Sequence, residues 1–132
     1  MIYRNTIQKR LVLDTVRRMT NHPTVEEIYE RIVMEHPSVS KGTVYRNLNI
    51  LAQQGEILRV QFPNAADRYD FNTRQHYHIR CRYCGKVDDV EMPYLEHLQE
   101  QITDCHGFQP LSHQIVFEGI CPACNGTALD KI

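Results

Sequence analysis

HYHIRCRYCGKVDD, residues 76–89, holds the densest group of metal-ligand side chains in the chain. Its fourteen residues contain a His-x-His pair, a Cys-x-x-Cys pair and two adjacent aspartates, which core packing does not explain. The Cys81/Cys84 pair has a counterpart in Cys121/Cys124 near the end of the chain. Two such pairs can form the tetrahedral thiolate cage that zinc prefers. The pattern therefore predicts a closed, structural zinc site, although the 36 residues between the pairs exceed the usual zinc-ribbon interval.

The composition is ordinary for a small soluble protein of one or two domains, with 132 residues, 42% hydrophobic and 23% charged. No apolar run approaches the ~20 residues of a membrane span. The N-terminal MIYRNTIQKR has no apolar signal segment after its basic residues, so we expect a cytoplasmic protein. In that reducing compartment, metal binding is favoured over disulfide formation for the five cysteines.

The charge is unevenly divided along the chain. Residues 1–71 carry ten Lys/Arg and eight Asp/Glu, a net charge of +2, whereas residues 72–132 carry five and eight, a net charge of −3. The first part is therefore the better candidate for a nucleic-acid partner. An asymmetry this small is equally compatible with an ordinary globular surface.

Three amphipathic segments precede the metal-ligand stretch, and their spacing predicts three helices. Thr24 and Glu27 form a capping-box pattern at the start of the second helix, which His36-Pro37 should end. Ser40 is expected to cap the third. The apolar residues that define the first helix are Ile7, Leu11, Val12, Val16 and Met19.

A predicted β-hairpin follows the helices, with strands at Ile57–Phe62 and Arg68–Phe71 around a PNAAD turn. Three short helices followed by a hairpin indicate a winged helix, in which the third helix enters the major groove of DNA. Alternatively, the polar side of that helix is only a solvated surface. The side chains expected to be exposed there for DNA contact are Lys41, Thr43, Tyr45, Arg46 and Asn47.

The chain after the cysteine pair predicts a small α/β module. Pro93 suits a first helical turn, Gly107 ends the same segment, and residues 108–118 are predicted as a strand. Cys105 lies on the apolar stripe of the predicted helix and is expected to be a buried free thiol. The overall expectation is an α+β protein with a winged-helix domain at 1–71 and a small zinc-stapled α/β domain at 72–132.

Five segments together resemble the ferric uptake regulator (Fur) family, in particular its peroxide-sensing, PerR-like branch. They cover nearly the whole chain, which makes the resemblance specific. The segments are HPTVEEIYERI from His22, SKGTVYRNLNILAQQGEI from Ser40, RYDF from Arg68, HYHIRCRYCGKV from His76 and CPAC from Cys121.

The resemblance implies a homodimeric, metal-dependent transcriptional repressor that binds operator DNA, with residues 72–132 as its metal-binding dimerisation domain. It implies that the four paired cysteines hold structural zinc, in agreement with their spacing. It also implies a second, regulatory site for iron(II) or manganese(II), whose imidazole and carboxylate ligands suit these ions. The implied regulatory ligands are His22, Asp70, His76, His78 and Asp89.

In the PerR-like branch, the resemblance implies that peroxide reacts at the bound iron(II) and that oxygen is added to a histidine ligand, here His22 or His76. Asp89 and the HYH form of the histidine motif both favour this branch. An iron-uptake repressor, or another regulator that responds to iron, manganese or zinc, is the alternative, because the same ligands can hold each of these metals.

Other positions depart from the family pattern. Many relatives have a third metal site, and of the matching positions only Glu96 and His113 could ligate well, so a complete third site is not expected. Arg4 falls where relatives place a basic residue near the minor groove. Two further classes compete with a repressor, a redox or non-haem iron enzyme and a zinc-ribbon interaction module. The first lacks a thioredoxin-like strand-to-helix context, and the second leaves the winged helix unexplained.

Overall fold

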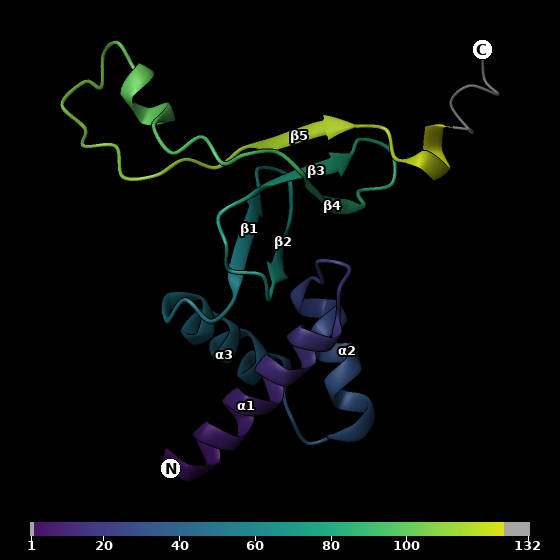
Figure 1. Cartoon of the computed structure of the whole chain (residues 1–132). Coiled ribbons are helices and arrows are strands. Elements are labelled where there is room, and N and C mark those ends of the chain that lie inside the picture. The colour runs from purple at the N-terminus through teal and green to yellow at the C-terminus, as the bar shows by residue number, and fades with distance from the viewer. Residues whose placement is uncertain (1, 126–132) are drawn as a thin grey trace. The chain divides into compact units, whose positions relative to one another are not determined.

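The computed structural model describes residues 2–125, with side chains from residue 6 onward (Figure 1). The chain divides into two compact units, Met1–Arg74 and Gln75–Ile132. Helices and two separate sheets confirm the expected α+β class. Within the described residues, no helix combines the length and the apolar character needed to cross a membrane.

The N-terminal unit consists of three helices and a hairpin. The helices are α1 (Ile2–Arg18), α2 (Val25–Glu35) and α3 (Lys41–Gln53). The antiparallel hairpin follows, formed by β1 (Leu58–Phe62) and β2 (Ala65–Asp70). This is the element order predicted for a winged helix. The turn of the hairpin is shorter than the predicted PNAAD turn, because β2 already begins at Ala65.

Local hydrogen bonds fix where the second and third helices begin. At α2, the Glu27 amide donates to Thr24 Oγ1 at 3.3 Å, and the Thr24 amide donates to Glu27 Oε1 at 3.0 Å. This reciprocal pair confirms the predicted capping box. At α3, the Thr43 amide donates to Ser40 Oγ at 3.1 Å, which confirms the predicted cap. Both helices therefore start where the sequence pattern places them.

One apolar core joins the three helices to the hairpin. Each fully buried aliphatic side chain contributes about 1.5–3 kcal/mol to the free energy of unfolding. Tyr69 of β2 belongs to the same core and ties the hairpin to the helices. The most deeply buried aliphatic members are Val12, Val16, Ile28, Ile32, Val44, Leu48 and Leu51.

The C-terminal unit is built on a three-stranded sheet in the order β4-β3-β5. The central strand β3 (Tyr77–Cys81) pairs antiparallel with β4 (Val87–Val90) and parallel with β5 (Val116–Gly119). The parallel pairing places Cys81 opposite Gly119, so the chain leaves β5 beside the end of β3. The two cysteine pairs, far apart in sequence, are thereby brought to the same end of the sheet.

The segment between β4 and β5 differs from its prediction. The prediction of an α-helix after Pro93 is wrong, because the only helical turn among the described residues there is the 3₁₀ helix η1 (Leu98–Gln101). Two residues of the predicted apolar stripe stay exposed, with Leu95 41% and Ile102 47% accessible, so they do not provide the packing that would stabilise a helix. Cys105 is half-buried rather than buried for the same reason. The strand begins at Val116, not at residue 108.

Candidate metal centres

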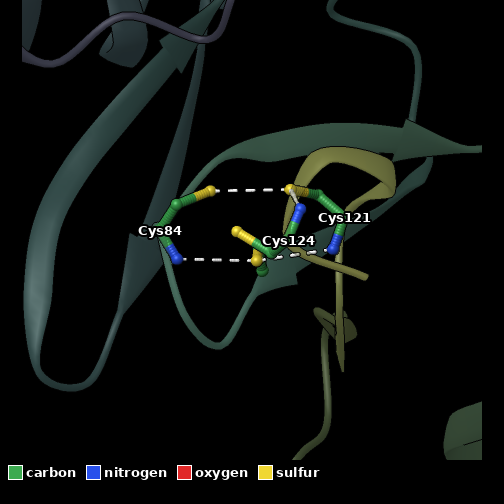
Figure 2. A group of neighbouring side chains, drawn as sticks. Cys84, Cys121 and Cys124 are labelled. Carbon is green, nitrogen blue, oxygen red and sulfur yellow. Dashed lines mark hydrogen bonds between the residues drawn. The ribbon is translucent and has the colours of Figure 1, made fainter. Parts of the chain in front are cut away.

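The four paired cysteines gather at one end of the C-terminal sheet. Cys81 ends β3, Cys84 lies in the turn that leads to β4, and Cys121 and Cys124 follow β5. The Arg82 amide donates to the Gly119 carbonyl at 2.8 Å and holds this turn against β5. In Figure 2 the labelled side chains of Cys84, Cys121 and Cys124 point their sulfur atoms toward one another.

The sulfur positions fit a tetrahedral metal site. The four Sγ atoms lie within 4.8 Å of one another, and Cys84 Sγ is 3.7 Å from Cys121 Sγ. With Zn–S bonds of about 2.3 Å, the edge of a regular tetrahedron of sulfurs is about 3.8 Å. A disulfide would need about 2.05 Å. The observed separation therefore fits thiolates around a zinc-sized ion.

Backbone amides around the cluster favour thiolates at some positions. The amides of Cys84 and Cys121 donate to Cys81 Sγ at 3.5 and 3.4 Å, and they lower the pKa of Cys81 to about 5. The Cys124 amide likewise lowers the pKa of Cys121. The Cys121 side chain, as hydrogen-bond partner, raises the pKa of Cys124 to about 12. Cys124 therefore keeps its proton unless a cation replaces it.

A second kind of donor set lies in the N-terminal unit. His22 Nε2 is 3.3 Å from Asp70 Oδ2, and both side chains are buried. The backbone that carries them is tied together, because the Tyr69 amide donates to the Pro23 carbonyl at 2.9 Å and Arg68 donates to the His22 carbonyl at 3.0 Å. The pair of donors is therefore held by the connection between β2 and the start of α2.

His22 also has an unusual backbone conformation. Its φ angle of 55° lies in the left-handed region, which costs a residue with a Cβ about 1–2 kcal/mol. The hydrogen bonds around Pro23 and Arg68 hold the chain in this conformation. Strain kept at a residue with a ligand-type side chain is consistent with a functional role.

The C-terminal unit provides a third donor set around one carboxylate. Asp89 Oδ1 lies 3.0 Å from His76 Nε2 and 3.4 Å from His78 Nε2. Pairing of His78 with Asp89 across β3 and β4 brings these residues together, and the two imidazole rings have centroids 4.5 Å apart. His76 precedes β3, so the alternate residues of the His-x-His motif reach the same carboxylate, as the strand periodicity predicts.

The chemistry of these donors differs from that of the cysteine cluster. Imidazole nitrogens and carboxylate oxygens suit iron(II) and manganese(II), whereas thiolates suit zinc. The N-terminal unit offers one of each type of donor, and the C-terminal unit offers two imidazoles and one carboxylate. Neither set by itself supplies the six donors of an octahedral ion.

Five of the six residues predicted to contact DNA lie on α3, and they differ in exposure. Tyr45 and Arg46 are exposed, and Thr43 is half-buried. Lys41 is exposed and forms an ion pair with Glu26 of α2. Arg4 falls within α1, and its side chain lies outside the described residues.

The expectation that Asn47 is exposed is wrong. Its side chain is only 6% accessible, and its Nδ2 donates to the Thr43 carbonyl at 2.9 Å. It lies one turn after Thr43, on the buried side of α3 that also carries Val44 and Leu48. Asn47 therefore stabilises α3 instead of presenting an amide for base contact.

Glu96 and His113, the candidates for a third metal site, lie in separate surroundings. Glu96 is exposed, and among the described residues neither of the two belongs to a cluster of three or more metal-ligand side chains. His113 instead contacts Tyr77, Tyr94 and Gln99. No sequence pattern predicted this polar cluster. Its one indication in the sequence is Tyr77, the tyrosine between the two motif histidines.

Comparison with known proteins agrees with this architecture. The sequence model of the "Ferric uptake regulator family" matches residues 2–118. The chain is 31% identical over 121 residues to the peroxide-responsive repressor PerR of Staphylococcus aureus strain USA300, a match that covers 92% of this chain and 82% of that protein.

Solved structures give the same result. The Campylobacter jejuni peroxide stress regulator superposes with a TM-score of 0.70 at 30% identity, covering 90% of this chain and 89% of that one. The Helicobacter pylori ferric uptake regulator Fur, described as having three functional metal binding sites, superposes with a TM-score of 0.72 at 27% identity, covering 89% and 79%.

Proposed function

Because the chain belongs to the ferric uptake regulator family, we propose that it is a dimeric, metal-dependent DNA-binding repressor rather than an enzyme, and that it senses peroxide through its own metal ligands. The observation that carries this proposal is that each compact unit builds its own imidazole-carboxylate donor set, separate from the cysteine cluster. A structural site and a regulatory site thus use different residues and different donor chemistry.

The N-terminal unit would bind operator DNA. Its α3 begins with a capped N-terminus and presents Tyr45 and Arg46 on an exposed surface. Arg46 can form a bidentate contact with guanine or an ion pair with phosphate, and Tyr45 offers a hydroxyl and an apolar ring. To contact a DNA phosphate, Lys41 would have to break its ion pair with Glu26. Its contribution to DNA affinity would therefore depend on the ionic strength.

The cysteine cluster would hold zinc permanently. Its four sulfurs have the spacing of a tetrahedral thiolate site, and a filled site of this kind leaves no open position for chemistry. Zinc there would staple the end of β3 to the chain after β5. A unit with so short a sheet buries little apolar surface, and zinc binding would supply part of the folding free energy that a larger core would give.

For the regulatory site we propose that both imidazole-carboxylate sets ligate one iron(II) or manganese(II) ion. The proposal follows the family pattern and the donor count, with two ligands from the N-terminal unit and three from the C-terminal unit. Five protein ligands leave one octahedral position open. Sharing of the ion would couple metal binding to the orientation of α3, and thereby to the spacing of two recognition helices in a dimer.

Peroxide sensing is the finer part of the proposal. Iron(II) held by these imidazole and carboxylate ligands would activate peroxide, and the two electrons that reduce the peroxide would come from the imidazole ring that is oxidised. Overall, one peroxide would add one oxygen atom to the ring of His22 or His76 and leave one water. The oxidised ring binds metal less well, so the repressor would release its operator. The similarity to PerR and to the C. jejuni peroxide stress regulator supports this branch.

A metal-uptake repressor is the second candidate. The chain is also similar to the H. pylori ferric uptake regulator, and the same five ligands suit either role. In that case the occupancy of the regulatory site by iron, manganese or zinc would itself be the signal. The two candidates differ in one respect, which is whether a histidine ligand is chemically altered.

The partner for assembly would be a second copy of the chain. The C-terminal unit exposes large apolar side chains, including Phe108 at 80% and Leu111 at 83% accessibility. Burial of apolar side chains of this size by a partner would favour association. Ile102 and Phe117 add to the apolar area of the same unit. A homodimer would bury them and place two winged helices on a two-fold operator.

Selection of binding sites from a random-sequence DNA duplex library tests the general proposal. The zinc-containing protein is incubated with the library with and without manganese(II). We expect enrichment of a sequence with two-fold symmetry only when manganese is present. Enrichment that does not depend on manganese, or no enrichment in either condition, would contradict a metal-dependent repressor.

A further inference from the structure

Tyr77 lies between His76 and His78 and points to the other side of the strand. It is 1% accessible. Its hydroxyl lies 2.7 Å from His113 Nε2, and the Leu95 amide donates to the same oxygen at 3.0 Å. One buried hydroxyl thus connects the central strand β3 with two points of the irregular segment between β4 and β5.

The proton positions in this cluster follow from its partners. His113 Nδ1 is 2.8 Å from Gln99 Oε1, and with the Gln99 amide in this orientation its oxygen can only accept, which assigns the proton to Nδ1. In a neutral imidazole Nε2 then accepts, and the Tyr77 hydroxyl is its donor. The same hydroxyl accepts from the Leu95 amide. Each of these groups therefore has a partner while the imidazole is neutral.

Ring contacts fix the imidazole further. Tyr94 stacks on His113 with centroids 4.7 Å apart and an interplanar angle of 9°, and its hydroxyl is 3.5 Å from Nδ1. Tyr77 stacks on Tyr94 with centroids 5.4 Å apart. A metal ion at either nitrogen of His113 would have to displace Tyr77 or Gln99. Glu96, the other candidate ligand, is exposed and is not part of the cluster.

We propose that this Tyr77–His113–Gln99 network is metal-free and that Tyr77 is a positioning residue for the His76/His78 pair. This proposal rests on the proposed function, because it assumes that His76 and His78 bind the regulatory metal. The network fastens the segment that contains Leu95 and Gln99 to one side of β3. A strand held from one side presents its alternate side chains on the other side in fixed positions, so His76 and His78 are pre-arranged around Asp89.

Tyr77→Phe and His113→Phe test the network in the full-length, zinc-containing protein. The first variant removes only the hydroxyl, and the second keeps a ring that can stack on Tyr94. Nitrogen-15 NMR of the histidine rings, recorded without manganese, should show an Nδ1-protonated His113 in the wild type. In Tyr77→Phe we expect the Nε2 resonance of His113 to shift, because it loses its donor. An Nε2-protonated ring in the wild type would overturn the proposal.

Metal binding gives the second readout. Elemental analysis should find the same number of metal equivalents in His113→Phe as in the wild type, and loss of one equivalent would mean that His113 is a ligand. In calorimetric titration with manganese(II), the affinity of Tyr77→Phe should fall about 10-fold, as for other groups that orient metal ligands. Unchanged affinity in Tyr77→Phe would refute the positioning role.

His97→Ala is the matched control. His97 lies in the same segment, is exposed and pairs only loosely with Glu100 at 3.5 Å. The His97→Ala variant should leave the NMR signals of His113, the number of bound metal equivalents and the manganese affinity unchanged. A wild-type protein that binds no manganese would count against the proposed regulatory site, whereas a wild type that binds manganese as tightly as Tyr77→Phe counts against the positioning role alone.

Discussion

His78 and Asp89 face each other across β3 and β4, with the imidazole Nε2 3.4 Å from the carboxylate Oδ1. The same oxygen lies 3.0 Å from His76 Nε2, so Asp89 is the shared centre of the C-terminal donor set. Its neighbour Asp88 pairs with Ile79 and accepts a hydrogen bond from the Asp89 amide at 2.9 Å. This difference between adjacent aspartates provides a controlled test of the regulatory site.

Asp89→Ala should lower manganese(II) affinity by about 100-fold or more, because it removes a charged ligand from between two imidazoles. Zinc content should not change, since the cysteine cluster is separate. Asp88→Asn removes the same charge next to the site and should change the affinity less than about threefold. Equal losses in the two variants would show that only local charge matters and that Asp89 is not a ligand.

His22 allows metal binding and backbone strain to be separated. His22→Gly and His22→Ala both remove the imidazole and should abolish manganese-dependent DNA binding. Glycine accepts a φ of 55° and alanine does not, so we expect the glycine variant to be more stable than the alanine variant by about 1 kcal/mol. Urea unfolding measures this difference. Retained manganese-dependent binding in both variants would remove His22 from the ligand set.

Zinc removal should affect folding rather than only regulation. Cys121→Ser should lose the zinc and lower the free energy of unfolding of the C-terminal unit by more than about 3 kcal/mol, because binding to a structural site adds directly to folding. Cys105→Ser is the control, since Cys105 is half-buried outside the cluster, and should cost less than about 1 kcal/mol. Full zinc content in Cys121→Ser would disprove a four-cysteine site.

The Arg82–Glu118 ion pair predicts a local pH dependence. Arg82 donates to the Glu118 carboxylate at 2.6 Å and lowers the pKa of Glu118, with a smaller effect from Arg80. Because the pKa of Glu118 is lower in the folded state, its ionised carboxylate stabilises the folded protein at pH values above the unfolded-state pKa. That stabilisation is lost as the pH falls through the folded-state pKa.

Carbon-13 NMR titration of the Glu118 carboxylate measures this effect. Arg82→Gln should move the pKa of Glu118 upward toward its usual value, and Arg80→Gln should move it less. A Glu118 titration that is the same in the wild type and in Arg82→Gln would argue against the ion pair.

Short-range patterns in the sequence predicted much of the fold. Thr24 with Glu27 and Ser40 with Thr43 are close in sequence, so their hydrogen bonds depend little on the rest of the chain. The cysteine cluster was also predictable, because two Cys-x-x-Cys pairs are typical of a structural zinc site.

Features that depend on distant contacts could not be predicted in this way. Asn47 looks like an exposed helix residue in sequence, and only the packing of α3 decides that it is buried. The apolar stripe after Pro93 satisfies helical periodicity, but Leu95 and Ile102 of this stripe stay exposed, so packing does not stabilise a helix there. The partners of His113 come from Tyr77 and Gln99, residues that no local pattern connects.

The most direct test of the central claim is peptide mass spectrometry of the anaerobically iron(II)-loaded protein before and after a brief stoichiometric peroxide pulse, with a manganese-loaded control. We predict that one oxygen atom is added at His22 or His76 in the iron form only, together with loss of DNA binding. Histidines that remain unmodified while iron still supports DNA binding would contradict peroxide sensing and would favour a metal-uptake repressor.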